Sequence, residues 1–238
     1  MGNAGVGSYD IAFKSFYRMP SGVRFFLLRL RPPWKREVMK MKTNRRINTV
    51  RLTECSVMLA LSVVLTFVKV WEMPMGGSVT LLSMLPVMLI SVKYPKWGFV
   101  CSSLFALTQL FAGIASGNVF VWCTSLFSVA VCALFDYLLP FTVLGAAGLP
   151  GNLYRGDSEK KRYVLMLAGF AAVMLLRFAC HFVTGVVIWG QWAPEGQSKF
   201  VYSLLYNGQY MLPEGILTFA AAAVLLKIPA VKKLLKRI

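Results

Sequence analysis

Long apolar segments are the feature of this sequence that most limits its possible folds. Apolar residues make up 57% of the 238 residues and charged residues only 15%, which is more apolar side chain than a soluble domain of this size buries. A helix that crosses a bilayer needs about 20 mostly apolar residues, and several segments approach or exceed that length. The apolar segments cover residues 55–70, 80–92, 97–113, 119–149, 163–190 and 200–228. The sequence therefore predicts an all-α integral membrane protein with six transmembrane helices, of which the second is short.

The basic residues between these segments predict the orientation of the chain. With six spans, the N-terminal residues, the connections at 92–97 and 150–162 and the C-terminus share one side of the membrane and are rich in Lys and Arg. The connections on the other side contain a single basic residue, Lys199. Because positively charged loops stay on the cytoplasmic side, both termini are predicted to be cytoplasmic. The net charge of +17 is spread over these segment ends, which indicates contact with the lipid bilayer and argues against nucleic acid as a partner.

Residues 1–42 differ in composition from the rest of the chain. Glycine, proline and basic residues are mixed here, and the apolar run at 25–28 is too short to span a bilayer. We interpret this region as a basic, disordered cytoplasmic extension, and residues 43–238 as a six-helix transmembrane substrate-binding domain. An alternative is a basic helix near residues 22–31 that lies on anionic lipid.

The cysteines and the single histidine are the residues most often used to bind a metal or a cofactor. All five cysteines lie within apolar segments and form no C-x-x-C pair, so we interpret them as small core residues rather than as a disulfide or metal set. The chain has one histidine and no Walker motif. The sequence therefore predicts no metal site and no cofactor.

A polar stripe crosses the fifth apolar segment. Arg177, His181, Gly185 and Trp189 follow one another at four-residue intervals, and in an α-helix each such step turns the side chain by only about 40°. Lipid offers these side chains no hydrogen-bond partner, so the stripe must face a protein interior or a watery cavity. This pattern predicts the wall of a binding site. For His181 alone, a hydrogen bond to a neighbouring helix explains the position as well as contact with a ligand does. For Arg177, a buried ion pair or a position near the membrane surface explains it better than contact with a ligand.

The fourth and sixth segments supply further polar side chains. Asp136 and Tyr137 lie deep in the fourth segment, where a carboxylate is costly unless it binds a ligand or pairs with a cation such as Arg177. The sixth segment carries a comparable stripe of three phenols, an amide and a carboxylate: Tyr202, Tyr206, Asn207, Tyr210 and Glu214.

These side chains together favour a ligand site over simple packing. An aromatic stripe alone is more often packing, but an amide and a carboxylate inside an apolar run favour a ligand. Trp189 and Trp192, at the outer end of the fifth segment, either anchor the protein in the membrane interface or offer a stacking face to a cationic ring. The set suits a small, flat, positively charged molecule captured from outside. The sequence shows no nucleophile motif, so no catalytic residue is predicted.

Several short motifs follow one another in an order that resembles a known family. They are Arg51-Leu-Thr-Glu54, Gly76-Gly77-Ser78 with Met84-Leu-Pro86, Asp136-Tyr137 with Leu144-Gly-Ala-Ala-Gly148, His181-Phe-Val-Thr-Gly185 with Trp189, and Tyr202-Ser-Leu-Leu-Tyr-Asn207. Over roughly residues 47–228 the chain resembles the thiamine-specific substrate-binding (S) component of energy-coupling factor (ECF) transporters, the ThiT/YuaJ family. The resemblance implies a non-enzymatic, six-helix component of a bacterial plasma membrane that binds thiamine with high affinity at its extracellular side.

The resemblance also implies which residues bind thiamine. In the family, an acidic residue and a tyrosine on the fourth helix line the pocket together with side chains of the fifth and sixth helices. The matching positions here are Asp136, Tyr137, His181, Gly185, Trp189, Tyr202 and Asn207, with Trp71 as the candidate for an aromatic residue of the first loop. Some members have Glu where this chain has the shorter Asp136. We add Glu214 to this set because it is a carboxylate inside the sixth apolar segment, where it could pair with the aminopyrimidine of thiamine.

An S component does not transport alone, so the resemblance implies partners. These are a transmembrane coupling protein and two cytoplasmic ATPase subunits. Docking on the coupling protein resembles a contact between small residues of two membrane helices. Ser56 and Ala60, four residues apart on the first span, are predicted to form that contact.

Other functions remain open from the residues alone. The same fold could bind another vitamin, such as the pyrimidine precursor of thiamine or riboflavin. A membrane enzyme could use His181 and Asp136 as acid and base, although the chain has no second histidine to support that chemistry. A structural membrane subunit without transport activity would tolerate replacement of Asp136, His181 and Asn207.

Overall fold

The structure is a computed structural model that describes residues 33–73, 76–117 and 122–235. Most of these residues are helical, and one small antiparallel sheet of two strands accompanies the helices. The predicted interfacial helix near residues 22–31 lies outside the described residues.

Contacts between Cα atoms divide the chain into two units, residues 1–52 and 53–238. The described part of the first unit belongs to helix α3 (Pro33–Thr66), which continues into the second unit. Residues 33–42, which the composition assigned to the extension, are part of this helix. The second unit contains all the other elements described below.

Four helical stretches of the described residues are long and apolar enough to cross a membrane. They are Asn48–Thr66 within α3, α5 (Pro95–Ser116), the stretch Leu126–Leu153 and α9 (Glu159–Val187). A fifth results if α10 (Lys199–Leu225) and α11 (Pro229–Leu235), which meet at an angle of 92°, are counted as one broken span. Large apolar side chains on these helices are exposed, which lipid accommodates and water does not. The prediction of a helical multi-pass membrane protein is confirmed to this extent.

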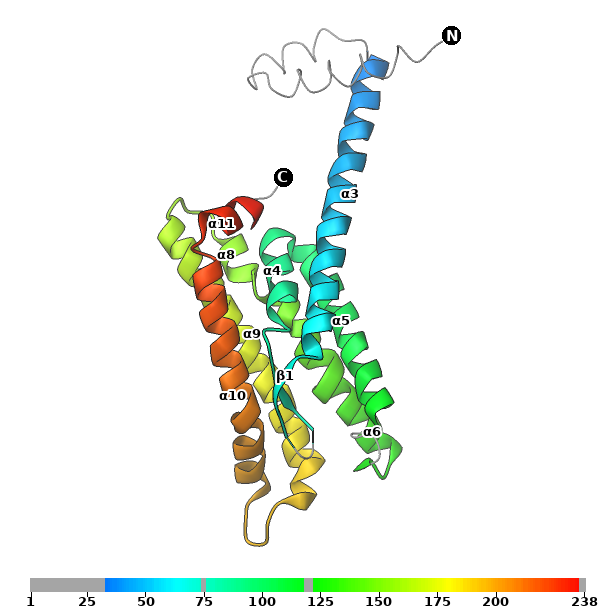
Figure 1. The fold of residues 1–238 in the computed structure, drawn as a ribbon, viewed down its shortest axis with the longest axis vertical. Coiled ribbons are helices and arrows are strands. Elements are labelled where there is room, and N and C mark those ends of the chain that lie inside the picture. The colour runs from blue at the N-terminus through cyan, green and yellow to red at the C-terminus, as the bar shows by residue number, and fades with distance from the viewer. Residues whose placement is uncertain (1–32, 74–75, 118–121, 236–238) are drawn as a thin grey trace. The chain divides into compact units, whose positions relative to one another are not determined.

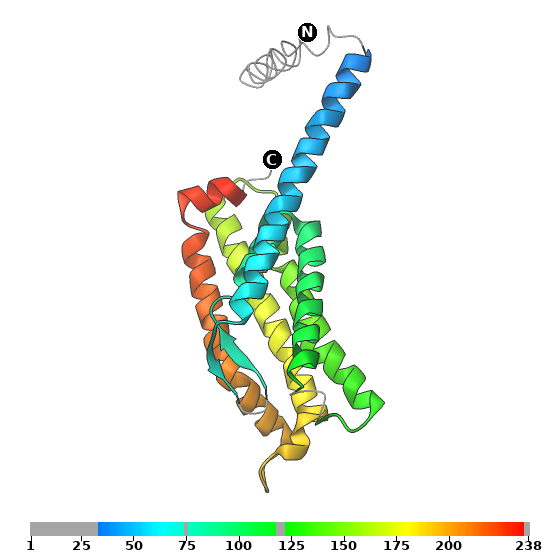
Figure 2. The ribbon, with the colours of Figure 1, turned by 45° about the vertical axis from the view of Figure 1, so that its right-hand side comes forward.

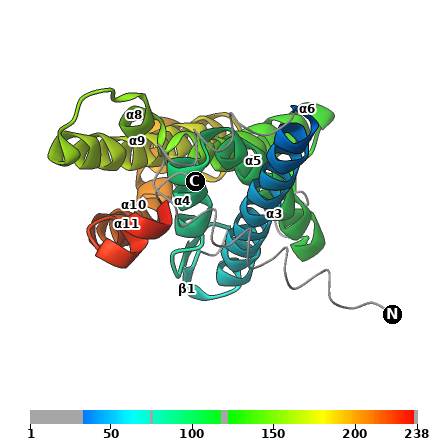
Figure 3. The same cartoon turned by 90° about the horizontal axis from the view of Figure 1, so that it is seen from above.

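The second predicted span has a different structure. Strands β1 (Lys69–Glu72) and β2 (Ser78–Thr80) form an antiparallel hairpin, and the nine-residue helix α4 (Leu85–Lys93) follows. At 1.5 Å per residue α4 is about 14 Å long, roughly half the thickness of the hydrocarbon core. All its residues are buried, and Figure 3 shows it between α5 and α10. Residues 80–92 therefore do not form a helix of membrane length; they are apolar because α4 is part of the core.

The fourth predicted span changes its helical geometry several times. It consists of α6 (Leu126–Cys132), the π-helix η2 (Ala133–Leu138), α7 (Leu139–Thr142), the 3₁₀-helix η3 (Val143–Ala146) and α8 (Leu149–Leu153). Pro140 has no N–H to offer the carbonyl of Asp136, and its ring crowds that carbonyl. The turn before Pro140 widens instead, and the N–H of Leu139 bonds the carbonyl of Leu134, five residues earlier. The turn before Pro140 is therefore a π-turn that contains Asp136, and such turns occur frequently at functional sites.

Helices α9 and α10 run side by side, and the hairpin lies against α10 (Figures 1 and 2). Gly185 on α9 allows this close approach: a Cβ at that position would overlap Ser203 Oγ and come within 2.8 Å of Asn207 Nδ2 on α10. The packing brings the polar stripes of α9 and α10 to the same interior, next to the π-turn.

Candidate functional site

A cavity of about 180 Å³ lies between the hairpin loop, α5, the π-turn, α9 and α10. Every residue predicted to bind the ligand lines it except Trp71. These lining residues are Asp136, Tyr137, His181, Gly185, Trp189, Tyr202, Asn207 and Glu214. The tertiary structure therefore gathers side chains from three predicted spans into one site.

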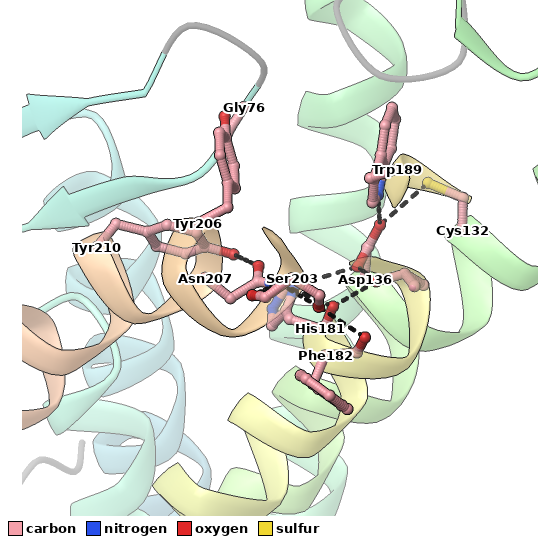
Figure 4. Close-up of polar contacts among 11 residues, drawn as sticks. Gly76, Cys132, Asp136, His181, Phe182, Trp189, Ser203, Tyr206, Asn207 and Tyr210 are labelled. Carbon is pink, nitrogen blue, oxygen red and sulfur yellow. Dashed lines mark hydrogen bonds and ion pairs between the residues drawn. The ribbon is translucent and has the colours of Figure 1, made fainter. Parts of the chain in front are cut away.

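The Asp136 carboxylate is the centre of a hydrogen-bond network (Figure 4). Its Oδ1 atom lies 3.1 Å from His181 Nδ1 and also accepts a hydrogen bond from the Thr184 hydroxyl. Its Oδ2 atom accepts from Trp189 Nε1 at 3.0 Å and from Cys132 Sγ at 3.4 Å. These donors fix the carboxylate in the wall of the cavity, where it provides a negative charge shielded from bulk water.

His181 has one occupied and one unoccupied ring nitrogen. With Asp136 ionised and the imidazole neutral, Nδ1 carries the proton and donates it to the carboxylate, which leaves Nε2 as an acceptor. His181 Nε2 is buried and has no hydrogen-bond partner among the described residues. A buried acceptor without a partner is costly, so this atom in a cavity-lining side chain is suited to receive an N–H from a ligand.

Asn207 has its amide bonded mostly within the protein. Its Nδ2 donates to the carbonyls of His181 and Ser203 at 3.1 and 3.0 Å, and its Oδ1 accepts from the Tyr210 hydroxyl at 2.9 Å. Ser203 Oγ in turn donates to the carbonyl of Phe182 at 2.8 Å (Figure 4). Asn207 therefore joins α9 to α10 at the site in addition to lining the cavity.

Glu214 forms a buried ion pair with Arg177, with 3.0 Å between Oε2 and Nη1. Its Oε1 accepts from the Thr80 hydroxyl at 2.6 Å, and Ser83 Oγ lies 2.6 Å from the same hydroxyl. Pairing with Arg177 was the alternative to a ligand role for Asp136, and the structure does not show that pair: Arg177 contacts Glu214, while Asp136 contacts His181. The ion pair, buried to 2% exposure at Glu214, attaches the hairpin to α9 and α10.

Gly76 and Gly77, at the end of the hairpin loop, line part of the cavity. The Tyr206 hydroxyl donates to the carbonyl of Gly76 at 3.0 Å, and Met73 N–H donates to the carbonyl of Gly77 at 2.9 Å. Gly77 has φ +89°, and a Cβ there would lie 2.7 Å from the Tyr210 ring. Glycine is therefore needed both for the backbone conformation and for the closeness of the loop to α10.

Trp71 lies outside this cavity. It is on strand β1 opposite Val79, and its side chain is 53% exposed. All four residues of β1 are exposed, whereas β2 contributes the buried residues of the hairpin. The aromatic side chains that the structure brings to the cavity include Tyr206 and Tyr210 of α10 instead.

Other lining residues were not singled out from the sequence. Thr66 and Gln109 line the cavity and bond each other, with 3.2 Å between Gln109 Nε2 and Thr66 Oγ1. Both are polar residues inside apolar segments, so the rule that identified Asp136 and His181 could have identified Gln109 as well. Thr80 and Ser83 also line the cavity, and they lie at the start of the apolar segment 80–92.

The charge of the cavity favours a cation. Among its lining residues, Asp136 and Glu214 are acidic and Arg177 is basic, and Arg177 is paired with Glu214. With a neutral His181, the Asp136 charge is not balanced by another lining residue. Trp189 donates a hydrogen bond to this carboxylate, so an indole and a negative charge lie side by side, and both attract a cation. Among the described residues no cluster of His, Cys, Asp and Glu has the composition of a metal site.

Comparisons with known proteins place the chain next to similar sequences. Residues 52–234 match the family described as thiamine transporter protein (Thia_YuaJ). The thiamine transporter ThiT of Bacillus subtilis (strain 168) is 34% identical to this chain over 181 residues, which is 73% of this chain and 88% of that protein. ThiT of Lacticaseibacillus paracasei is 33% identical over 99 residues, 40% of this chain and 49% of that protein.

A solved structure has the same fold. ThiT from Listeria monocytogenes matches with a TM-score of 0.60 over 79% of this chain and 98% of that chain. The two sequences are 21% identical, so this likeness is one of fold alone.

Proposed function

The chain belongs to the thiamine transporter protein family, and we propose that it is the high-affinity thiamine-binding S component of an ECF-type importer. In this proposal it captures thiamine at the extracellular side of a bacterial plasma membrane. A transmembrane coupling protein and two ATPase subunits then deliver the vitamin to the cytoplasm. The family is one of transporters, which implies that the chain is not an enzyme.

The observation that carries the proposal is the arrangement of Asp136, His181 and Trp189 around one cavity. The thiazolium ring of thiamine is a permanent cation, and the Trp189 indole together with the Asp136 charge suits it. A cation on an indole face is stabilised by about 2 kcal/mol when both are shielded from water. The aminopyrimidine ring carries an amino group, whose N–H suits the unpartnered His181 Nε2.

We assign the remaining lining residues to orientation and shape. Tyr137 and Tyr202 supply aromatic walls, and Gly185 leaves space next to Ser203. Asn207 and Glu214 hold the walls in place through their bonds within the protein, and each retains acceptor capacity toward the aminopyrimidine.

The proposed topology has six crossings with both termini in the cytoplasm. The hairpin and α4 together make the second crossing, which is possible because α4 is buried in protein rather than exposed to lipid. The distribution of basic residues supports this orientation.

Docking on the coupling protein is assigned to the first span. Ser56 and Ala60 lie on the part of α3 that belongs to the second unit, and both are exposed there. Because both side chains are small, a second helix can approach α3 closely at this point.

Calorimetric titration of the detergent-purified protein tests the proposed ligand. Thiamine, its hydroxymethylpyrimidine precursor and riboflavin are titrated separately into the same preparation. We expect thiamine to bind most tightly, with one site per chain. Tighter binding of the precursor or of riboflavin would keep the S-component fold and replace the substrate. Absence of binding by all three, in protein that melts cooperatively, would favour a structural membrane subunit.

A further inference from the structure

A second cavity, of about 520 Å³, lies near the other end of α9 from the proposed thiamine site. It is lined by residues of α8, of the turn that follows, of the first turns of α9, and of the α10–α11 corner. Arg162 lines this cavity and His181 lines the first one. At 1.5 Å per residue their positions on α9 are about 28 Å apart, so the two cavities are separate sites.

The lining of this cavity combines exposed cations with a buried apolar base. Arg155, Arg162 and Lys232 are exposed basic residues, and Glu159 is the acidic residue of the lining. The Glu159 side chain is 86% exposed and its carboxylate lies 4.0 Å from Lys232 Nζ, so its interaction with Lys232 is weak. The cavity therefore keeps a net positive charge.

The apolar part of the lining is shielded from water. Val92 and Leu226 are 4% and 5% exposed, and Met166 and Leu235 are partly buried beside them. A water-soluble anion would need the cations but would gain nothing from this apolar base. A molecule with an anionic head and a hydrocarbon tail uses both parts.

The cavity lies where the long helices end. α9 begins at Glu159, and α10 ends at Leu225 before the chain turns by 92° into α11. Tyr154 and Tyr163 line the cavity, and tyrosine is enriched at the membrane–water interface. Lys161 Nζ lies 5.4 Å from the centroid of the Tyr154 ring, which places another cation beside the site.

We propose that this cavity binds an anionic phospholipid of the adjacent leaflet. The phosphate of the headgroup contacts the guanidinium groups of Arg155 and Arg162, which can bind phosphate oxygens in a bidentate manner, and Lys232 adds a third cation. The first methylene groups of the acyl chains pack on Leu226 and Met166. With the proposed topology this is the cytoplasmic leaflet, where anionic lipids attract basic residues near the ends of membrane helices.

Native mass spectrometry of the full-length protein tests this site. The protein is released from micelles that contain equal amounts of phosphatidylglycerol and phosphatidylcholine, and the retained lipids are counted. The test variant combines Arg155→Gln, Arg162→Gln and Lys232→Gln. The matched control combines Lys96→Gln, Lys160→Gln and Lys233→Gln, which removes the same charge from residues that do not line the cavity.

We expect the wild type and the control to retain phosphatidylglycerol in clear preference to phosphatidylcholine. In the test variant, the ratio of retained phosphatidylglycerol to retained phosphatidylcholine should fall by on the order of tenfold or more. An equal loss in test and control variants would overturn the proposal, since the attraction would then belong to the whole basic surface. Equal retention of the two lipids by the wild type would overturn it as well.

A competition experiment separates lipid from free phosphate. Inorganic phosphate and glycerol 3-phosphate are added at millimolar concentration, and we expect phosphatidylglycerol to stay bound. Displacement by either soluble anion would identify a site for a soluble phosphate compound and contradict the lipid assignment. Thermal unfolding of each variant in detergent reports folding without reference to thiamine, so failure of the lipid site is distinguishable from failure of the proposed transport function.

Discussion

Asp136 Oδ1 lies 3.1 Å from His181 Nδ1, although the two residues come from different spans and are 45 positions apart. The π-turn before Pro140 presents the carboxylate, and α9 presents the imidazole. This contact orients the imidazole of a cavity-lining residue and leaves its second nitrogen buried without a partner among the described residues.

Replacing Asp136 by asparagine should weaken thiamine binding by about 10- to 100-fold, the effect of losing an interaction with a charged group worth about 1.5–3 kcal/mol. The amide nitrogen of asparagine cannot accept the hydrogen bonds that Trp189 and Cys132 donate to Oδ2. Calorimetry measures the change. The control is Asp157→Asn, because Asp157 is an exposed carboxylate that does not line the cavity. An unchanged affinity in Asp136→Asn would contradict the proposed counter-charge.

Replacing Gly185 by alanine should lower stability by about 1–3 kcal/mol, because the new methyl group overlaps Ser203 Oγ and crowds Asn207. Gly208→Ala is the matched control: a Cβ there has no atom within 4 Å, and alanine favours a helix over glycine by about 0.5–1 kcal/mol. The unfolding temperature measured in detergent should therefore fall for Gly185→Ala and rise for Gly208→Ala. Equal shifts would mean that the α9–α10 contact is not tight at Gly185.

Breaking the Arg177–Glu214 pair should destabilise the protein by about 3–5 kcal/mol, because the remaining charge stays buried without its partner. We expect Glu214→Gln and Arg177→Met each to lower the unfolding temperature. The double variant should lose much less stability than the two single variants lose together. The double-mutant cycle isolates the interaction of the two side chains. Strictly additive losses would argue that the pair does not interact.

The two tryptophans of the predicted site should behave differently. Trp189→Phe removes the N–H that bonds Asp136 and should weaken thiamine binding, whereas Trp71→Phe changes an exposed side chain outside the cavity and should leave the affinity within about twofold. Both variants remove one indole, so calorimetry is preferred to tryptophan fluorescence. A large loss in Trp71→Phe would support the first-loop aromatic implied by the family resemblance.

Docking on the coupling protein should depend on small side chains at Ser56 and Ala60. The double variant Ser56→Leu with Ala60→Leu should retain thiamine binding but lose association with the coupling protein and ATPases when all are produced together. Val100→Leu is the control, since Val100 is an exposed apolar residue on α5. Co-purification through an affinity tag on one ATPase measures association, and retention of the complex in the double variant would assign docking elsewhere.

The candidate site could be predicted from sequence because lipid makes polar side chains costly. Asp136, His181, Asn207 and Glu214 interrupt apolar segments, and such residues have to face the protein interior. The structure places all of them around one cavity. The same reasoning applied to Gln109 would have extended the site to α5.

The pairing of charges could not be predicted in the same way. A four-residue spacing shows which side chains share a face of a helix, but it does not show which residue of another helix they meet. Arg177 had two carboxylates available, and the arrangement of α9 against α10 selected Glu214. Likewise, nothing in the local sequence distinguished an exposed β1 from a loop that turns Trp71 inward.

Sequence alone determined the membrane class, the helical character of most segments and the identity of the polar residues that face inward, because hydropathy and helical periodicity act locally along the chain. Only the tertiary structure decided that residues 85–93 form a buried nine-residue helix after a hairpin, and that Pro140 produces a π-turn. It also decided that Asp136 contacts His181 while Glu214 contacts Arg177. These features depend on contacts between residues far apart in the chain, whose geometry is set by the packing of helices against one another.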